Sequence, residues 1–138
     1  EGYDILEYEE LLRVSDVVSF HTALTPETRH LLDERRIALM KPGAVVVNTA
    51  RGAVIDTVAL ASALSEGRLW GAGIDVFEDE PVSPDHPLLR APHTVLTSHA
   101  AYWSEESGRE LRERTMRSAI DVVCGRRPAD CLNPEVLD

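Results

Sequence analysis

The sequence has few of the features that mark membrane, secreted or disulfide-stabilised proteins. No apolar run approaches the roughly 20 residues that a membrane-spanning helix needs, and the first residues show no secretory signal pattern. Cysteine is scarce as well: Cys124 and Cys131 stand near the C-terminus without a cluster of other ligand residues. We therefore expect free thiols rather than a disulfide, no metal site, and a soluble cytoplasmic protein.

Positive charge is also in short supply. The chain has 14 basic residues against 24 acidic ones, a net charge of -10, and Lys41 is its only lysine. An excess of negative charge disfavours binding to nucleic acid or to an anionic membrane surface. We expect neither as the main partner.

A glycine-rich phosphate-binding loop is missing too. No Gly-x-Gly-x-x-Gly occurs, nor the acidic residue that follows it by about 20 positions in dinucleotide-binding domains. The chain starts at Glu1 rather than at a methionine, with helix-like sequence almost at once. We expect these 138 residues, enough for one modest domain, to be a fragment of a longer polypeptide with little activity alone.

What is present is organised around Ala44–Asp56, with the sequence AVVVNTARGAVID. Its β-branched run predicts a strand buried on both faces, as in a parallel sheet under helices. Ligands of such sheets bind beyond the carboxyl ends of the strands. Arg51 is expected at that end, on a short turn.

Strand-like and helix-like segments alternate along the chain. Further strands are predicted at 16–20, 70–76 and 94–97, and helices at 7–14, 33–40, 56–66 and 104–124, with a short helix begun by Thr25 and Pro26. This alternation predicts the α/β class with a parallel sheet.

Three of the predicted strands end in turns with chemically capable side chains: Arg51, the acids Glu78–Glu80, and His99. Neighbouring parallel strands point the same way, so these turns should meet at one edge of the sheet. Arginine can bind a substrate carboxylate through two hydrogen bonds. Histidine beside a carboxylate can donate a proton to a carbonyl oxygen, so the three together suit the reduction of a keto acid.

Each of these residues also has a purely structural interpretation. Taken singly, Arg51 fits a surface or capping arginine, His99 a loop histidine, and the acids at 78–80 a solvated loop. His30 is expected to start a helix, and His86 and His93 flank prolines in turns, so these three favour structural roles. His21, at the end of a strand, stays open.

The amino-acid sequences of several segments resemble those of the D-isomer-specific 2-hydroxyacid dehydrogenase family. The similar stretches are SDVVSFHTALTPETRHLL, LMKPGAVVVNTARGAVID, GRLWGAGIDVFEDEP and VLTSHAA, in the family's order, and the likeness runs from about Asp16 to Pro134. That family includes phosphoglycerate dehydrogenase, glyoxylate/hydroxypyruvate reductase, D-lactate dehydrogenase and formate dehydrogenase. The resemblance implies a partial Rossmann-like, doubly wound sheet without its first strands, and hydride transfer between NAD(H) and a 2-hydroxy or 2-keto acid.

The resemblance also implies roles for single residues. Its catalytic residues correspond to Arg51, to Glu80 directly before a proline, and to His99. The implied NAD contacts are Thr22, Ala23, Leu24, Thr28, Thr49, Ala50, Arg51, Asp75, His99, Ala101 and Tyr102. Ser98 departs from the family's usual proline before the histidine, which should loosen that turn.

The tail is similar to a branch of the same family, the C-terminal-binding-protein transcriptional corepressors. Those proteins have Trp-Tyr where this chain has Tyr102-Trp103. The branch implies an alternative function, a protein-interaction module gated by NAD(H) that does not require turnover.

The resemblance divides the chain into residues 1–101, the C-terminal part of a dinucleotide-binding domain, and 102–138, a long helix and tail that return to a substrate domain. It implies a homodimer. In the doubly wound order 3-2-1-4-5-6, loss of strands 1 and 2 would separate the strand at 16–20 from its neighbours. We therefore expect the isolated chain to dimerise, swap or aggregate through that edge.

Overall fold

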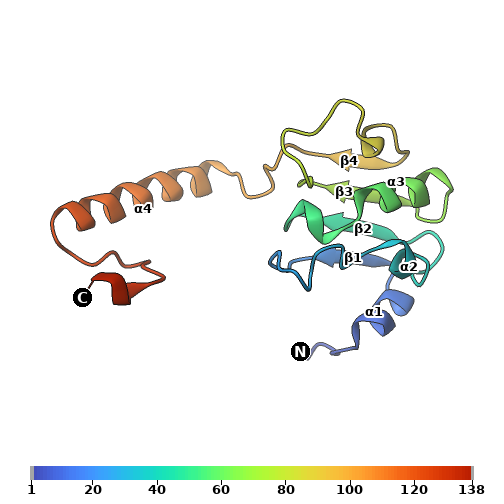
Figure 1. Cartoon of the computed structure of the whole chain (residues 1–138), viewed down its shortest axis with the longest axis horizontal. Helices are drawn as coiled ribbons and strands as arrows, with labels where there is room; N and C mark the ends of the chain where they lie inside the picture. Colours follow the sequence, from blue (N-terminus) through green and yellow to red (C-terminus); the bar gives the residue numbers. More distant parts are fainter. Residues whose placement is uncertain (1, 138) are drawn as a thin grey trace. The chain divides into compact units, whose positions relative to one another are not determined.

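The computed structural model describes residues 2–137, and their contacts divide them into two compact units. The boundary along the chain lies between Ala101 and Tyr102. The roles expected for the two parts, in cofactor binding and in a substrate domain, stay predictions. Figure 1 shows the elements of each unit. The first unit contains α1 (Tyr8–Val14), β1 (Val17–Phe20), α2 (Glu34–Ile37), β2 (Val45–Asn48), η1 (Gly52–Val54), α3 (Thr57–Ser65), β3 (Gly71–Ile74), η2 (Pro87–Leu89) and β4 (Thr94–Leu96).

The four strands of the first unit form one parallel sheet in the order β1-β2-β3-β4. Val17 to Phe20 pair in register with Val45 to Asn48. The prediction that the strand at 16–20 is separated from its sheet neighbours is therefore wrong. This strand lies beside the next strand in the sequence and pairs with it along its whole length. This places the strand ends of the whole sheet at one edge, as parallel pairing requires.

One face of the sheet is covered and the other is not. Val18, Phe20, Val46 and Ile74 point into a core shared with residues of α1, α2 and α3, such as Leu12, Ile37 and Leu60. On the opposite face Val17 is 59% exposed and Val95 70% exposed, and Val45 and Val47 are half-buried. The prediction of a strand buried on both faces is thus wrong, because the helices of the described chain pack on one face only.

Local signals placed most helix ends correctly. The carboxylates of Asp33 and Asp56 accept backbone hydrogen bonds at the starts of α2 and α3, and Gly67 ends α3 with φ of 70°. Helix α2 is shorter than predicted. The segment begun by Thr25 and Pro26 is a turn and not a helix, held by the hydroxyls of Thr25 and Thr28.

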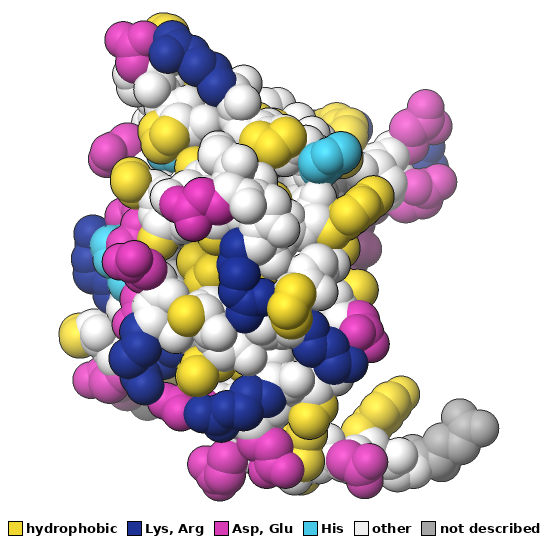
Figure 2. Space-filling view, turned by 90° about the vertical axis from the view of Figure 1, so that its right-hand side faces the viewer, with side chains coloured by type: hydrophobic (Ala, Val, Ile, Leu, Met, Phe, Trp, Pro, Cys, Tyr) yellow, Lys and Arg dark blue, Asp and Glu magenta, His cyan; other side chains and the backbone are white. Residues whose placement is uncertain are grey.

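The amino ends of the strands carry side chains of both signs (Figure 2). Lys41 and Asp16, just before β2 and β1, are joined at 2.9 Å. Arg35 of α2 reaches Glu9 of α1 at 2.8 Å. These ion pairs are exposed, so each contributes little to stability.

The second unit contains α4 (Glu105–Val123) and η3 (Pro134–Leu137). Ser104 and Ser107 form a capping box at the start of α4, and Gly125, with φ of 67°, ends it as predicted. Trp103 covers Gly108, where a Cβ would lie 2.7 Å from the indole ring. No helix of the described chain is long and apolar enough to span a membrane. Both cysteines are free thiols, as predicted.

Candidate active site

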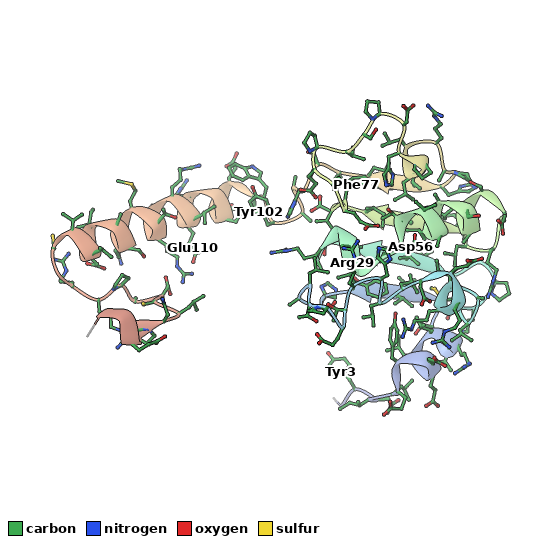
Figure 3. The ribbon with its side chains drawn as sticks, viewed as in Figure 1. Tyr3, Arg29, Asp56, Phe77, Tyr102 and Glu110 are labelled. Carbon is green, nitrogen blue, oxygen red and sulfur yellow. The ribbon has the colours of Figure 1, made fainter. Side chains whose placement is uncertain are left out.

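The carboxyl ends of β2, β3 and β4 bring three loops to the same edge of the first unit. Arg51 follows β2, Glu80 follows β3 and His99 follows β4. In Figure 3, Phe77 marks the loop after β3 and Arg29 the turn after β1. The three residue types that the sequence predicts for keto-acid reduction thus follow three adjacent strands.

The turn that carries Arg51 is fixed by the buried side chain of Asn48. Its amide donates to the carbonyl of Arg51 and accepts from the backbone of Ala50, both at 3.0 Å. Gly52 packs against the backbone of the loop after β3, since a Cβ at this position would lie 1.9 Å from the carbonyl carbon of Phe77. Only glycine fits so close an approach, so the Arg51 turn and the Glu80 loop are held against each other.

Arg51 itself is exposed, and its guanidinium donates to the carbonyl of Ala50 at 2.6 Å. Within residues 2–137 no carboxylate lies at ion-pair distance from it. It borders a hollow of about 490 Å³ at the ends of β1 and β2, which is lined by His21, Thr22, Ala23, Leu24, Thr49, Ala50 and Arg51. A free guanidinium at such a hollow can bind an anionic group.

His99 and Glu80 form a hydrogen-bonded pair, with Nδ1 of the imidazole 2.8 Å from the carboxylate. The hydrogen bond from His99, followed by one from the backbone of Phe77 at 3.0 Å, holds the pKa of Glu80 below its usual value. His99 has φ of 55°, a left-handed conformation that is uncommon for residues other than glycine. Both side chains line a hollow of about 730 Å³ with an apolar wall that includes Pro81, Val82 and Leu89.

The turn that carries His99 is held by Asp75, which is buried at the end of β3. Its carboxylate accepts from the hydroxyl of Thr97 and from the backbones of Ala100 and Ala101, at 2.8 and 2.9 Å for the last two. Burial by itself would raise the pKa of Asp75, but the hydrogen bonds from Thr97, Ala101 and Ala100 outweigh it and lower this pKa. Asp75 thus supports the turn although Ser98 stands where the family has proline.

The predicted cofactor residues fall into separate groups. Thr22, Ala23, Leu24, Thr49, Ala50 and Arg51 line one hollow. Thr28 instead ties its own loop together through the carbonyl of Ala23 at 2.7 Å. Ala101 is bound to Asp75, and Tyr102 belongs to the second unit, exposed and edge-to-face with Trp103. His21 lines the first hollow, and its Nε2 lies 2.8 Å from the hydroxyl of Ser19.

The sequence interpretation missed several polar residues behind the site. Glu78 is not a solvated acid: it is half-buried and contacts Arg29, His30 and Thr57. His30 does not start a helix but stands in a turn with φ of 48°. Asn48 had a usable signal, since asparagine after a strand and before a turn commonly binds the backbone two residues on. For Glu78 no local sequence signal predicted its contacts, because its partners are distant in the sequence.

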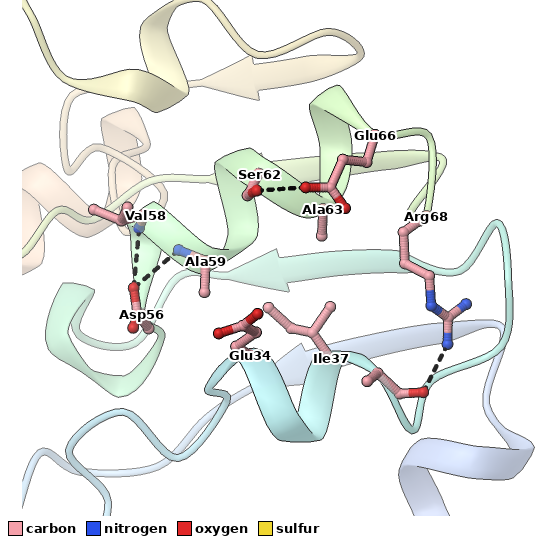
Figure 4. A pocket seen from close by; sticks show the side chains of 10 residues that line it. Glu34, Ile37, Asp56, Val58, Ala59, Ser62, Ala63, Glu66 and Arg68 are labelled. Carbon is pink, nitrogen blue, oxygen red and sulfur yellow. Dashed lines mark hydrogen bonds between the residues drawn. The ribbon is translucent and has the colours of Figure 1, made fainter.

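Another hollow, of about 420 Å³, lies between α2 and α3 (Figure 4). Its polar side chains already serve the fold: Asp56 caps α3, Ser62 donates to Glu66, and Arg68 donates to the carbonyl of Ala38. None of the predicted site residues lines it. We assign this hollow no role in the chemistry.

Comparison with known proteins now identifies the class of protein. Residues 1–101 match the NAD binding domain of the D-isomer specific 2-hydroxyacid dehydrogenases, and the chain belongs to that family. The glyoxylate reductase of Thermofilum pendens is 44% identical over 134 residues, and that of Aeropyrum pernix is 42% identical over 136. The alignments cover 97% and 99% of this chain but 40% and 41% of those proteins. The chain thus spans about two fifths of the length of these relatives.

Solved structures agree with this assignment. The TT0316 protein from Thermus thermophilus has a TM-score of 0.89 and 45% identity over 94% of this chain and 41% of its own. The D-lactate dehydrogenase of Aquifex aeolicus, in complex with NAD and lactic acid, has a TM-score of 0.78 and 39% identity over 85% of this chain and 40% of its own. The predicted α/β Rossmann-like fold and the family resemblance are confirmed.

Proposed function

We propose that this chain takes part in the reversible transfer of a hydride between NADH and a 2-keto acid, which yields NAD and the D-isomer of the 2-hydroxy acid. The observation that carries the proposal is the His99–Glu80 pair, 2.8 Å apart, formed by the loops after β4 and β3, with Arg51 on the loop after the neighbouring strand β2. The names of the relatives support the same reaction, since two are glyoxylate reductases and one structure holds NAD and lactic acid.

The three side chains divide the chemistry among them. Arg51 binds the substrate carboxylate through charge-assisted hydrogen bonds and orients the keto group. His99, held at Nδ1 by Glu80, donates its Nε2 proton to the carbonyl oxygen, which becomes the hydroxyl. When bound, NADH supplies the hydride that reaches the carbonyl carbon. In the reverse reaction His99 accepts the hydroxyl proton.

The hollow at the ends of β1 and β2 suits a dinucleotide. Thr22 and Thr49 line it and are exposed, and hydroxyl and backbone groups are the partners that sugars and amides need. We assign Thr22, Ala23, Leu24, Thr49 and Ala50 to cofactor binding. Asp75, Thr28 and Ala101 act by holding the loops, because their polar groups are already engaged there. Tyr102 is kept as a cofactor contact on the resemblance alone.

The finer details of assembly and location are part of the same proposal. We propose a homodimer in the cytoplasm that acts on a small 2-keto acid and not on nucleic acid or membranes. The exposed valines of the uncovered sheet face, Val17 and Val95, support an association surface. The net charge of -10 supports a small-molecule substrate over a nucleic-acid partner.

The test is NADH oxidation by the protein as its gene encodes it, with glyoxylate, pyruvate and hydroxypyruvate as substrates. His99→Ala should lower kcat by on the order of 100- to 10,000-fold with NADH affinity retained. Arg51→Ala should lower kcat and also raise KM for the keto acid, because it removes ground-state binding. NADH binding without oxidation on any of these acids, or full turnover by His99→Ala, would contradict the proposal.

A second candidate function is an NAD(H)-gated interaction module of the corepressor type. It is favoured by the aromatic pair Tyr102 and Trp103, which are 60% and 57% exposed at the start of the second unit. A module of this kind would keep its partner binding in both His99→Ala and Arg51→Ala, and its affinity would change on addition of NADH. Partner binding that falls with kcat in these variants would exclude it.

A further inference from the structure

Glu78 lies at the centre of a polar network behind the Glu80 loop. One carboxylate oxygen, Oε2, lies 3.0 Å from Nε2 of His30 and 3.3 Å from the guanidinium of Arg29. The other, Oε1, accepts from the hydroxyl of Thr57 at 3.3 Å. Glu78 thus joins its own loop to the turn after β1 and to the first residue of α3.

The hydrogen-bond directions in this network are fixed by elimination. The Thr57 hydroxyl has one proton and donates it to Glu78. In its contact of 3.2 Å with Nε2 of His86, the hydroxyl oxygen must therefore accept, and Nε2 must carry the proton and donate it. Nδ1 of His86 accepts from the backbone of Leu88 at 3.3 Å and is therefore unprotonated. His86 is held as the neutral Nε2–H tautomer, and the chain of donors runs from His86 through Thr57 to Glu78.

The network controls the loop that carries Glu80. Glu78 is two residues from Glu80, and the peptide bond between Phe77 and Glu78 is pressed against Gly52, directly beside Arg51. The Phe77 ring packs edge-on against His86 with centroids 5.6 Å apart, while the Phe77 backbone donates to Glu80. Movement of the Glu78 side chain would therefore shift the carboxylate that holds His99, whereas the Phe77–Glu78 peptide stays packed against Gly52 beside Arg51.

We propose that Glu78 is a positioning residue for the reaction: tied by Arg29, His30 and the Thr57–His86 chain, it sets the placement of Glu80 against His99. This inference rests on the proposed function. Glu78 touches none of the reacting groups that the proposed function names, so it acts only through the loop. Loss of its charge should loosen the His99–Glu80 pair while leaving Arg51 and the cofactor hollow in place.

The test compares Glu78→Gln with Asp79→Asn in the protein as its gene encodes it. Asp79 is the exposed neighbour in the same loop and lies outside the network, so the control makes the same chemical change one residue away. Glu78→Gln should lower kcat on the order of 10- to 100-fold, more than it raises KM. The pH profile of kcat should also change in Glu78→Gln and not in Asp79→Asn, because the carboxylate of Glu80 that binds His99 is displaced. Identical kcat and pH profiles in the two variants would overturn the proposal.

Two further variants keep the test decisive if Glu78→Gln does not fold. Thr57→Val removes the hydroxyl and keeps the shape, whereas Thr57→Ser keeps the hydroxyl. We expect Thr57→Val to lower kcat and to shift the pH profile in the same direction as Glu78→Gln, and Thr57→Ser to restore both. A wild-type profile in a folded Thr57→Val variant would overturn the proposal.

Imidazole nitrogen NMR separates failure of this inference from failure of the proposed function. His86 should give the Nε2–H tautomer, and the proton on Nδ1 of His99, which Glu80 binds, should exchange faster with water in Glu78→Gln but not in Asp79→Asn. Neither readout needs turnover. If no 2-keto acid is reduced, the exchange rate of the His99 proton still decides whether Glu78 positions the pair. A protonated Nδ1 on His86 in the wild type would contradict the network itself.

Discussion

The two units of the chain bury very different amounts of apolar surface. The first packs side chains such as Leu12, Val46 and Leu60 at 0% exposure into one core. From Tyr102 to Glu135, the range of the second unit whose burial is described, only Gly108 is buried, and Met116 and Ile120 of α4 are exposed. The first unit therefore holds its candidate site by tertiary packing. The second holds its helix by local interactions, such as the capping box and the Arg114–Glu110 pair.

The largest effect should come from a change that forces the two site loops apart. Gly52→Ala places a methyl group 1.9 Å from backbone atoms of Phe77, which cannot move aside as a side chain can. We expect a loss of about 3 kcal/mol or more in the free energy of unfolding, measured with urea. Gly73→Ala is the control, because its Cβ would meet only Val47 at 3.9 Å. Equal stability of the two variants would refute the close packing of the loops.

A smaller loss is expected at the turn that carries His99. Asp75→Asn replaces one carboxylate oxygen by an amide group that cannot accept, so at least one of the hydrogen bonds from Thr97, Ala100 and Ala101 is lost and stability should fall by about 2 kcal/mol at pH 7. The pKa of Asp75 is lowered by folding. The ionised carboxylate of Asp75 therefore contributes fully to the free energy of unfolding above the pKa of about 4 that it has in the unfolded chain. This contribution is lost as the pH falls through the lower pKa of the folded protein. Urea titrations should show the two proteins converging in stability at acid pH, and a constant difference down to pH 2 would contradict this assignment.

Removal of the helix caps should sharpen the contrast between the units. Asp56→Ala and Ser104→Ala each remove a cap worth about 1 kcal/mol. Because α3 is part of a core, we expect Asp56→Ala to lower the midpoint of global unfolding. Ser104→Ala should instead reduce helical circular dichroism without moving that midpoint. The comparison fails if both variants shift the midpoint equally.

The smallest effect is expected on the outer surface of α4. Ile120 is 51% exposed, so Ile120→Gln removes little buried surface and should change the unfolding free energy by less than about 0.5 kcal/mol. The check is a thermal melt of the variant beside the wild type. A loss above about 1.5 kcal/mol would show that this side chain is buried in the protein in solution.

The features that the sequence predicted well are local ones. Asp33, Asp56 and Ser104 cap helices because the side chain and the backbone groups it binds are two or three residues apart. The class of fold was predicted correctly from the alternation of strand-like and helix-like segments. The prediction for the strand at 16–20 was wrong because it depended on an assumed order of strands in the sheet, which local sequence patterns do not determine. The His30–Glu78 contact joins residues 48 positions apart, so no sequence pattern near either residue predicts it. The His99–Glu80 contact was expected because the ends of neighbouring parallel strands share one edge of the sheet, and the family resemblance selected Glu80 among the three acids of its loop.

The strand order also has a consequence for how the protein is made. Each strand of the sheet adds beside the one that precedes it in the sequence, so a chain leaving the ribosome can lengthen the sheet from one side without reopening it. The anchored turn of Arg51 can form once β2 and β3 are in place. The proposed proton donor comes later, because His99 follows β4. During synthesis the protein would therefore gain the proposed anion-binding group, Arg51, before the proposed acid, His99.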